Sequence, residues 1–420
     1  MGIPDFDRKL VDYADLAIRV GLNLQPGQRL LITNLSSGGV VLEAAPLVRQ
    51  LTAAAYRAGA RFVDVLWADE PLRLMRFEQA PRDSFEEYPD WQVAAALEYV
   101  ERGDAMLSVK ADDPDLLRAQ DPALVGLSRR VTSQKVAPVL EHIERNATNW
   151  LVIAAATPAW AARIFPEVPA AEQTDRLWQS IFAMCRVDAP DPVAAWRAHV
   201  ANLIARRDYL NAKAYSALHY TGPGTDLTVG LPKGHLWDSA GMPSQQGIEF
   251  IANLPTEEVF TLGDRGRVEG TVTASRPLSY GGTLIDGFSV TFAGGRAVNV
   301  HAERGETVLR SLIDTDEGAG RLGEVALVPH SSPIAQTGRV FLSTLIDENA
   351  ASHLAFGSAY RFSLQGAESL SDEAFAAAGG NTSLVHVDFM IGSGELDVDG
   401  VKADGSIEPV MRRGEWAFEV

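Results

Sequence analysis

The pattern of apolar and polar residues differs between the two halves of the chain. In the first half, short apolar segments at 30–33, 62–67, 105–109 and 150–155 alternate with longer stretches whose apolar residues recur at helical spacing. Apolar strands separated by helices are typical of a mostly parallel sheet with helices on both faces. The first half is therefore predicted to be an α/β domain.

Two helices of this half carry recognisable signals at their ends. Asp5 precedes one apolar-periodic stretch and is predicted to cap its first turn. A second helix, at about 45–58, has Pro46 in its first turn and Gly59 where a left-handed residue commonly ends a helix. Both stretches are expected to flank the sheet.

Beyond residue 215, Gly, Thr and Val become more frequent and strand patterns dominate. The segment FSVTFAGGRAVNV alternates apolar and polar residues on both sides of Gly294-Gly295, which predicts a hairpin. With a boundary near residue 210, we predict an α/β domain at 1–210 and a β-rich α+β catalytic domain at 211–420. Further strands of this domain are expected at 227–231, 250–253, 259–262 and 268–273.

Composition limits the classes of partner. The chain has 420 residues, of which 46% are hydrophobic and 22% charged, as in ordinary globular enzymes. Its 37 Lys and Arg against 55 Asp and Glu give a net charge of −18, which argues against nucleic acid or an anionic membrane as a partner.

The N-terminus and the cysteine content bear on the compartment. The N-terminal segment is acidic where a signal peptide would be basic, and no apolar stretch is long enough to span a bilayer. Cys185 is the single cysteine, so neither an intrachain disulfide nor a cysteine-based zinc site is possible. A cytoplasmic protein without a membrane partner is expected.

Several catalytic classes lack their motifs. The sequence contains no Walker A loop, no Gly-x-Ser-x-Gly elbow and no His-Glu-x-x-His pair. The segment TGPGTD is rich in glycine but leads into a predicted strand, so it is interpreted as a turn and not as a phosphate-binding loop. Any catalytic activity would therefore have to depend on a different set of residues.

The segment SLVHVDFMI near the C-terminus has the period of a half-buried strand. Side chains two apart on a strand share a face, so His386 and Asp388 are expected to point the same way, opposite an apolar face. An imidazole and a carboxylate placed together make a natural pair of metal ligands. The alternative is an ordinary hydrogen-bonded histidine beside a solvated aspartate.

Further oxygen and nitrogen donors concentrate in the same half. Histidines and carboxylates without a thiolate suit a dinuclear Zn, Co or Mn site, whose metals share a hydroxide, better than a structural zinc. Each residue also has an ordinary alternative, such as a strand-edge charge for Glu258, a cap for Glu324 and a core aromatic for Tyr360. The donors are Glu257, Glu258, Glu324, Asp347, Glu348, His353 and Tyr360.

Five segments of the second half resemble the signature blocks of a thermophilic metalloaminopeptidase family, of the aminopeptidase T and aminopeptidase S type. They are YTGPGTDLTVGLP, NLPTEEVFTL, LGEVALVP, DENAASHLAFGSAY and NTSLVHVDFMIGS. The similarity extends over essentially the whole chain, with PGQRLLIT and AYRAGARFVDVLW as less distinctive N-terminal matches. The family's metal-site positions fall on Glu258, Glu324, His353, Tyr360, His386 and Asp388.

The resemblance implies an aminopeptidase that holds two divalent metal ions per chain, cleaves peptides with a free N-terminus and forms a homodimer. Tyr360 would be either a ligand or a donor to the scissile carbonyl oxygen, and Glu348 is the first candidate for the general base. Glu257 or Glu348 could also hold the substrate's α-amine. Two alternatives stay open, namely a non-catalytic binder of metals or small molecules and a metallo-amidase acting on non-peptide substrates.

Overall fold

The computed structural model describes residues 2–280 and 283–420, and the chain divides into two compact units. The first comprises Met1–His199 and Gly241–Pro255, and the second comprises Val200–Ala240 and Thr256–Val420. The predicted boundary near residue 210 differs from this division in two respects. The units change within helix α8 (Pro192–Lys213), and the segment 241–255 returns to the first unit, where one of its strands joins the sheet.

A five-stranded sheet forms the centre of the first unit, and all of its strand pairs are parallel. This sheet, with its flanking helices, confirms the predicted α/β class. In spatial order its strands are β12 (Asn253–Leu254), β6 (Trp150–Ala154), β5 (Ala105–Lys110), β1 (Arg29–Thr33) and β3 (Phe62–Val65). Smaller pairs are β2 (Val40–Val41) with β4 (Trp67–Ala68), and β10 (Met242–Pro243) with β11 (Glu249–Phe250).

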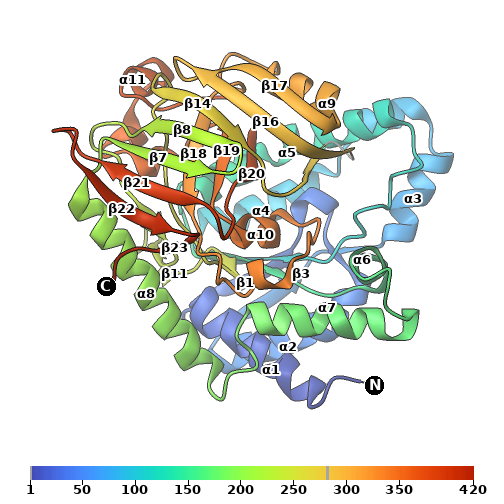
Figure 1. The fold of residues 1–420 in the computed structure, drawn as a ribbon. Coiled ribbons are helices and arrows are strands. Elements are labelled where there is room, and N and C mark those ends of the chain that lie inside the picture. Colours follow the sequence, from blue (N-terminus) through green and yellow to red (C-terminus); the bar gives the residue numbers. More distant parts are fainter. Residues whose placement is uncertain (1, 281–282) are drawn as a thin grey trace. The chain divides into compact units, whose positions relative to one another are not determined.

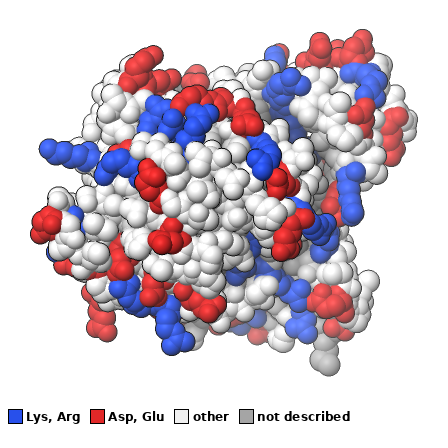
Figure 2. Space-filling view, turned by 45° about the horizontal axis from the view of Figure 1, so that its top comes forward, with Lys and Arg blue, Asp and Glu red and all other residues white. Residues whose placement is uncertain are grey.

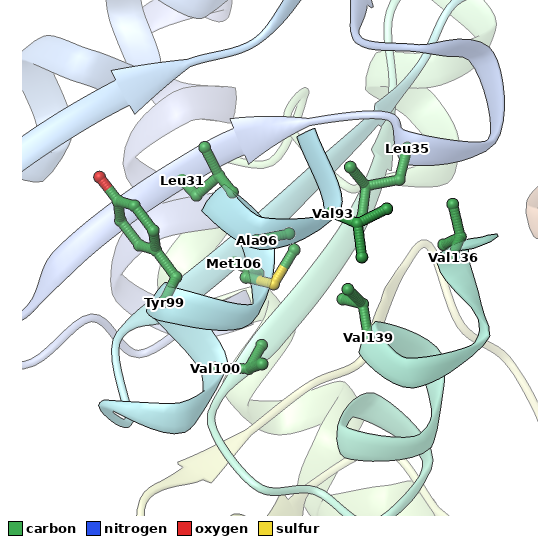
Figure 3. Close-up of a cluster of buried hydrophobic side chains, with 9 residues drawn as sticks. All are labelled: Leu31, Leu35, Val93, Ala96, Tyr99, Val100, Met106, Val136 and Val139. Carbon is green, nitrogen blue, oxygen red and sulfur yellow. The ribbon is translucent and has the colours of Figure 1, made fainter. Parts of the chain in front are cut away.

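One face of this sheet is covered by α4 (Asp90–Glu101) and α5 (Pro122–Glu144). Leu31 of β1 and Met106 of β5 pack against Val93 of α4 and Val139 of α5 in one apolar cluster (Figure 3). Burial of this kind is worth roughly 25 cal/mol per Å² of apolar surface. The cluster therefore fixes β1 and β5 side by side under the two helices.

Helix α1 (Phe6–Leu16) contacts the sheet through Tyr13, whose hydroxyl donates to the Ala154 carbonyl at 3.0 Å. The predicted capping role of Asp5 is wrong, because its carboxylate accepts from Arg8 and makes no cap bond. Gly59 has a φ of +96° just after α2 (Ala45–Arg57), as predicted. The other helices of this unit are α3 (Glu70–Gln79), α6 (Pro158–Ile164) and α7 (Ala170–Met184).

The second unit contains a five-stranded and a nine-stranded antiparallel sheet, which confirms its β-rich character (Figure 1). The smaller sheet has the order β20 (His386–Met390), β19 (His353–Gly357), β18 (Leu322–Leu327), β13 (Val259–Thr261) and β9 (Asp238–Ser239). The larger has the order β15 (Leu278–Tyr280), β16 (Thr283–Ala293), β14 (Val268–Thr273), β8 (Thr225–Gly230), β7 (Ala217–Gly222), β21 (Asp397–Val401), β22 (Ile407–Arg412) and β23 (Glu415–Trp416). Strand β17 (Arg296–Arg304) pairs with β16 to form the predicted hairpin.

Aromatic rings join the two sheets of this unit. Phe292 of β16 stacks on Phe356 of β19 at 6.3 Å between ring centroids, and Phe356 stacks on Phe389 of β20 at 4.5 Å. Because side chains alternate along a strand, the residues between these phenylalanines face away from the shared apolar layer. Short helices α9 (Glu306–Ile313), α10 (Thr344–Asp347) and α11 (Asp372–Ala377) complete the unit.

On the face shown in Figure 2, Lys and Arg side chains lie interspersed with Asp and Glu. Among the described residues, no helix is long and apolar enough to cross a membrane.

Candidate metal centre

Adjacent strands of the smaller sheet place the predicted ligands on one face. Glu324 of β18 and Asp388 of β20 are both in register with Ala355 of β19, which lies between them. His386 is in register with Gly357 in the same way. Because alanine and glycine occupy the strand between the donors, the larger side chains on either side can converge above it.

The remaining ligands enter from the ends of two strands. His353 is the first residue of β19, and Glu258 directly precedes β13. Phe260 of β13 is in register with Ala326, which is itself in register with His353. Because side chains two positions apart on a strand share a face, Glu258 lies on the same face of the sheet as Phe260 and His353.

A bulge beside Glu324 depends on glycine. The pairing of β18 with β19 shifts between Leu322 and Glu324, and a Cβ on Gly323 would lie 2.4 Å from the Gly357 carbonyl oxygen. A larger residue there would push the strands apart. Gly323 is therefore the residue that lets Glu324 approach its neighbours.

The ligand atoms form two groups that share Glu324. The Nε2 atom of His353 lies 3.3 Å from Glu258 Oε2 and 3.4 Å from Glu324 Oε1. The other oxygen of Glu324 lies 3.5 Å from Nε2 of His386, which is 3.4 Å from Asp388 Oδ1. In each group, Glu258–Glu324–His353 and Glu324–His386–Asp388, the ligand atoms lie within 4.8 Å of one another.

Backbone contacts orient both imidazoles toward this centre. Nδ1 of His353 donates to the Ala351 carbonyl at 3.1 Å, and Nδ1 of His386 donates to the Ser358 carbonyl at 2.7 Å. In the neutral ring this leaves the Nε2 lone pair directed at the carboxylates, the arrangement usual for metal-binding histidines. Asp388 Oδ1 is buried and accepts no hydrogen bond within the described residues. The donor set therefore fits a divalent metal.

The pKa values show that, without a metal ion, bound protons must balance the negative charges of the carboxylates in this centre. Burial raises the pKa of Glu258 to about 7, although nearby His353 opposes the effect. Burial lowers the pKa of both imidazoles, but the surrounding carboxylates outweigh it and raise each to about 10. Burial and the histidine charge act oppositely on Asp388, and its pKa falls below the usual value. A metal ion can replace the imidazole protons.

Glu348 lies beside this centre, in the turn after α10. Burial and the neighbouring Glu258 raise the pKa of Glu348 well above its usual value. Asn349 holds the turn in place, since its amide donates to Glu348 at 3.4 Å and its carbonyl oxygen accepts from the Glu257 backbone N–H at 2.7 Å. Glu348 is therefore a buried carboxyl group held beside the ligand groups.

Two other acidic residues singled out from the sequence lie outside both ligand groups. Asp347 accepts from the backbone N–H groups of Phe341 at 2.6 Å and Ser343 at 3.0 Å, and burial raises its pKa to about 6. Glu257 is buried next to Glu258. Asp347 thus organises the loop that carries Glu348.

Tyr360 belongs to an aromatic wall made of Phe260, Tyr360 and Phe362. Its ring lies 5.1 Å from the His386 ring and 5.1 Å from Phe362, and the Phe260 ring lies 6.2 Å away. Burial of its hydroxyl and the carboxylates of Glu324 and Asp388 raise the pKa of Tyr360 well above the usual value. The phenol therefore keeps its proton and can donate it in a hydrogen bond.

Phe260 and Phe362 were not predicted from the sequence as site residues. Phe260 follows Glu258 by two positions in a strand, so the same alternation that paired His386 with Asp388 places it on the ligand face. Phe362 had no such signal, because the segment around it forms a short 3-10 turn, Arg361–Ser363.

The chain is similar to known proteins over nearly its whole length. The family described as thermophilic metalloprotease (M29) matches residues 6–416. Aminopeptidase T of Thermus thermophilus is 49% identical over 98% of this chain and 99% of its own. Aminopeptidase 2 of Geobacillus stearothermophilus is 46% identical over 99% of both. The solved structure of wild-type AmpT from Thermus thermophilus matches with a TM-score of 0.92 at 48% identity, covering 98% of this chain and 100% of the other.

Proposed function

The chain belongs to the thermophilic metalloprotease family M29, and on this premise we propose that it is an aminopeptidase with a dinuclear metal centre. The observation that carries the proposal is the sharing of Glu324 between two ligand groups, with one carboxylate oxygen facing each histidine. In a two-metal site, a carboxylate that faces both positions could serve both ions.

Two divalent ions, of Zn, Co or Mn, would be held by this donor set. Glu258 and His353 complete one position and His386 and Asp388 the other. Such ions supply a water-derived nucleophile near neutral pH and polarise a carbonyl oxygen. The absence of thiolate ligands favours a catalytic over a structural site.

Glu348 and Tyr360 are assigned the proton chemistry. Glu348 accepts the proton of the attacking water and returns it to the leaving amine, as a general base and then acid. The Tyr360 phenol donates a hydrogen bond to the oxygen that becomes negative at the scissile carbonyl. Its raised pKa suits this role, because the hydroxyl stays protonated beside Glu324 and Asp388.

We assign to the aromatic wall the binding of the side chain of the substrate's N-terminal residue, which the reaction removes. Phe260 and Phe362 are both partly exposed and lie next to Tyr360. Apolar N-terminal residues such as leucine would pack there, because burying their apolar surface against the aromatic rings is favourable. The substrates are therefore peptides with a free N-terminus, preferably with an apolar first residue.

The experiment is an assay of leucine p-nitroanilide after chelation and after return of Zn, Co or Mn. We expect activity to vanish on chelation and to return with a divalent metal, while N-acetyl-leucine p-nitroanilide stays uncleaved. Equal cleavage of the blocked substrate would favour a metallo-amidase, and bound metal without turnover would favour a binder. The homodimer and the cytoplasmic location stay predictions.

A further inference from the structure

A second polar cluster lies at the carboxyl edge of the parallel sheet in the first unit. Strand β1 has β3 on one side and β5 on the other, so the chain runs from β1 to β3 and then crosses over to β5. The connections therefore diverge at the carboxyl ends of β1 and β5. In open α/β sheets, ligands bind at such a switch point.

Side chains at and just beyond the ends of both strands are hydrogen-bonded to one another there. Lys110, the last residue of β5, donates from Nζ to Asn34 Oδ1 at 3.0 Å and to Ser36 Oγ at 3.2 Å. The Asn34 amide donates to Asp112 Oδ2 at 2.8 Å. Ser36 is exposed and Asp112 half-buried, so the cluster, which we term the switch-point site, reaches the surface of its unit.

The switch-point site has unused hydrogen-bonding capacity. Oδ1 of Asp112 and Oγ1 of Thr33 are buried and bond to nothing within the described residues. Thr33 is 2% exposed and is in register with Ser108, which shares a strand face with Lys110. An ammonium has three donors, and the described contacts of Lys110 use two. Buried polar groups left without partners are costly, so a ligand is expected to supply them.

The start of helix α3 adds one charge of each sign. Glu70 accepts from the Asp113 backbone N–H at 2.7 Å. Arg73 is partly buried, and burial lowers its pKa while the nearby carboxylates of Asp112 and Glu70 raise it. Burial also raises the pKa of Glu70 to about 7 and lowers that of Lys110. Basic and acidic side chains thus share a poorly hydrated place, and Glu43, Asp113 and Arg129 lie near enough to affect the pKa values of Glu70 and Arg73.

This mixture of signs selects the ligand class. Asp112 and Glu70 would repel a phosphate, and Lys110 and Arg73 would repel a divalent cation. A small molecule that carries both charges satisfies both pairs. We propose that the switch-point site binds a free α-amino acid, with its carboxylate toward Lys110 and Arg73 and its ammonium toward Asp112. The proposal is independent of the metal centre, although the reaction assigned to that centre would release such molecules.

The test is calorimetric titration of the full-length His386→Ala variant, in which the metal centre is damaged, with a panel of free L-amino acids. We expect at least one amino acid to bind, and the corresponding amide and N-acetyl derivative, which each lack one charge, to bind about tenfold or more weakly. Lys110→Met should weaken binding to a similar extent. Lys135→Met, which removes an exposed amine of the same unit, should leave it unchanged.

Asp112→Asn provides a second variant of nearly the same shape, in case Lys110→Met fails to fold. It should weaken binding of the amino acid and leave the melting temperature near that of the parent. If no amino acid of the panel binds the His386→Ala variant, or if Asp112→Asn binds as well as its parent, the proposal is overturned and the unpaired atoms hold only water. Neither result would bear on the aminopeptidase activity.

Discussion

The metal centre and the switch-point site are both buried polar clusters at the edge of apolar layers, but they balance charge differently. The metal centre combines three carboxylates with two imidazoles, and its described ligands include no lysine or arginine. At the switch-point site, the acidic side chains of Asp112 and Glu70 lie near the basic side chains of Lys110 and Arg73. The first can reach neutrality only with bound protons or a cation, whereas the second contains basic side chains of its own.

This difference indicates what each cluster selects. Buried carboxylates that lack a fixed positive partner cost free energy until a cation compensates them, so the first cluster favours divalent metals. A cluster that carries its own cations gains less from a metal, and a small molecule with one charge of each sign can interact with both kinds of side chain. We expect this contrast in charge to determine which ligand each cluster binds.

The largest effect is expected from Glu324→Gln. The neutral amide would hold divalent ions far less well than the carboxylate, so kcat/KM for leucine p-nitroanilide should fall by at least about 100-fold. Metal analysis of the same preparation should show fewer ions per chain. Glu395→Gln, at an exposed position of the same unit, is the control and should keep full activity. Wild-type turnover by Glu324→Gln would refute the shared ligand.

Glu348→Gln should lower kcat by roughly 10² to 10⁴, as for the loss of a general base, while the metal content stays unchanged. This separation of kcat from metal content distinguishes a proton-transfer group from a ligand. Loss of metal together with activity would instead make Glu348 part of the donor set.

Tyr360→Phe should lower kcat by roughly 10²-fold with little change in KM, because the hydroxyl acts on charge that develops in the transition state. Tyr56→Phe, half-exposed in the other unit, should have no effect. A rise in KM alone would mean that Tyr360 only holds the substrate.

Phe260→Ala should lower kcat/KM for leucine p-nitroanilide by roughly tenfold and leave that for alanine p-nitroanilide nearly unchanged. The physical reason is the loss of apolar surface beside Tyr360. An equal loss on both substrates would indicate disturbance of Glu258, which lies on the same strand face, and not a specificity role.

The smallest effect concerns pH and the switch-point site. The pKa of Glu70 is raised from 4.5 to about 7 by burial, so the folded protein holds this proton more tightly than the unfolded chain. The contribution of Glu70 to the free energy of unfolding therefore decreases as the pH rises from 4.5 to about 7. The decrease is on the order of 1–3 kcal/mol. Urea unfolding at pH 5 and pH 8 should show a smaller loss in Glu70→Gln than in wild type. An identical pH dependence would contradict the shift.

Periodicity and local signals predicted much of the architecture. The alternation of SLVHVDFMI placed His386 and Asp388 on one face, and the structure brings them within 3.4 Å of each other. The apolar strands of the first half and the hairpin at Gly294-Gly295 were also predicted, because each depends on residues close in sequence. The choice of Glu258 over Glu257, made by matching the resembling segment, rested on the place of Glu258 directly before Val259 and Phe260.

Features that depend on which strands are neighbours in the sheet were not predicted. Lys110, Asn34 and Asp112 gave no motif, and they meet only because β5 lies next to β1 in the sheet. The return of 241–255 to the first unit likewise depends on the pairing of β12 with β6. The capping prediction for Asp5 failed because a local ion pair with Arg8 takes its carboxylate. Long-range pairing leaves no mark in a single sequence window.

The most direct measurement is the number of divalent ions bound per chain in wild type, His353→Ala and His386→Ala, determined by metal analysis after dialysis against Zn. The account predicts two ions in wild type and loss of tight binding at one position in each variant, since the histidines belong to different ligand groups. A single ion in wild type, whose binding both variants abolish, would contradict a dinuclear centre that shares Glu324.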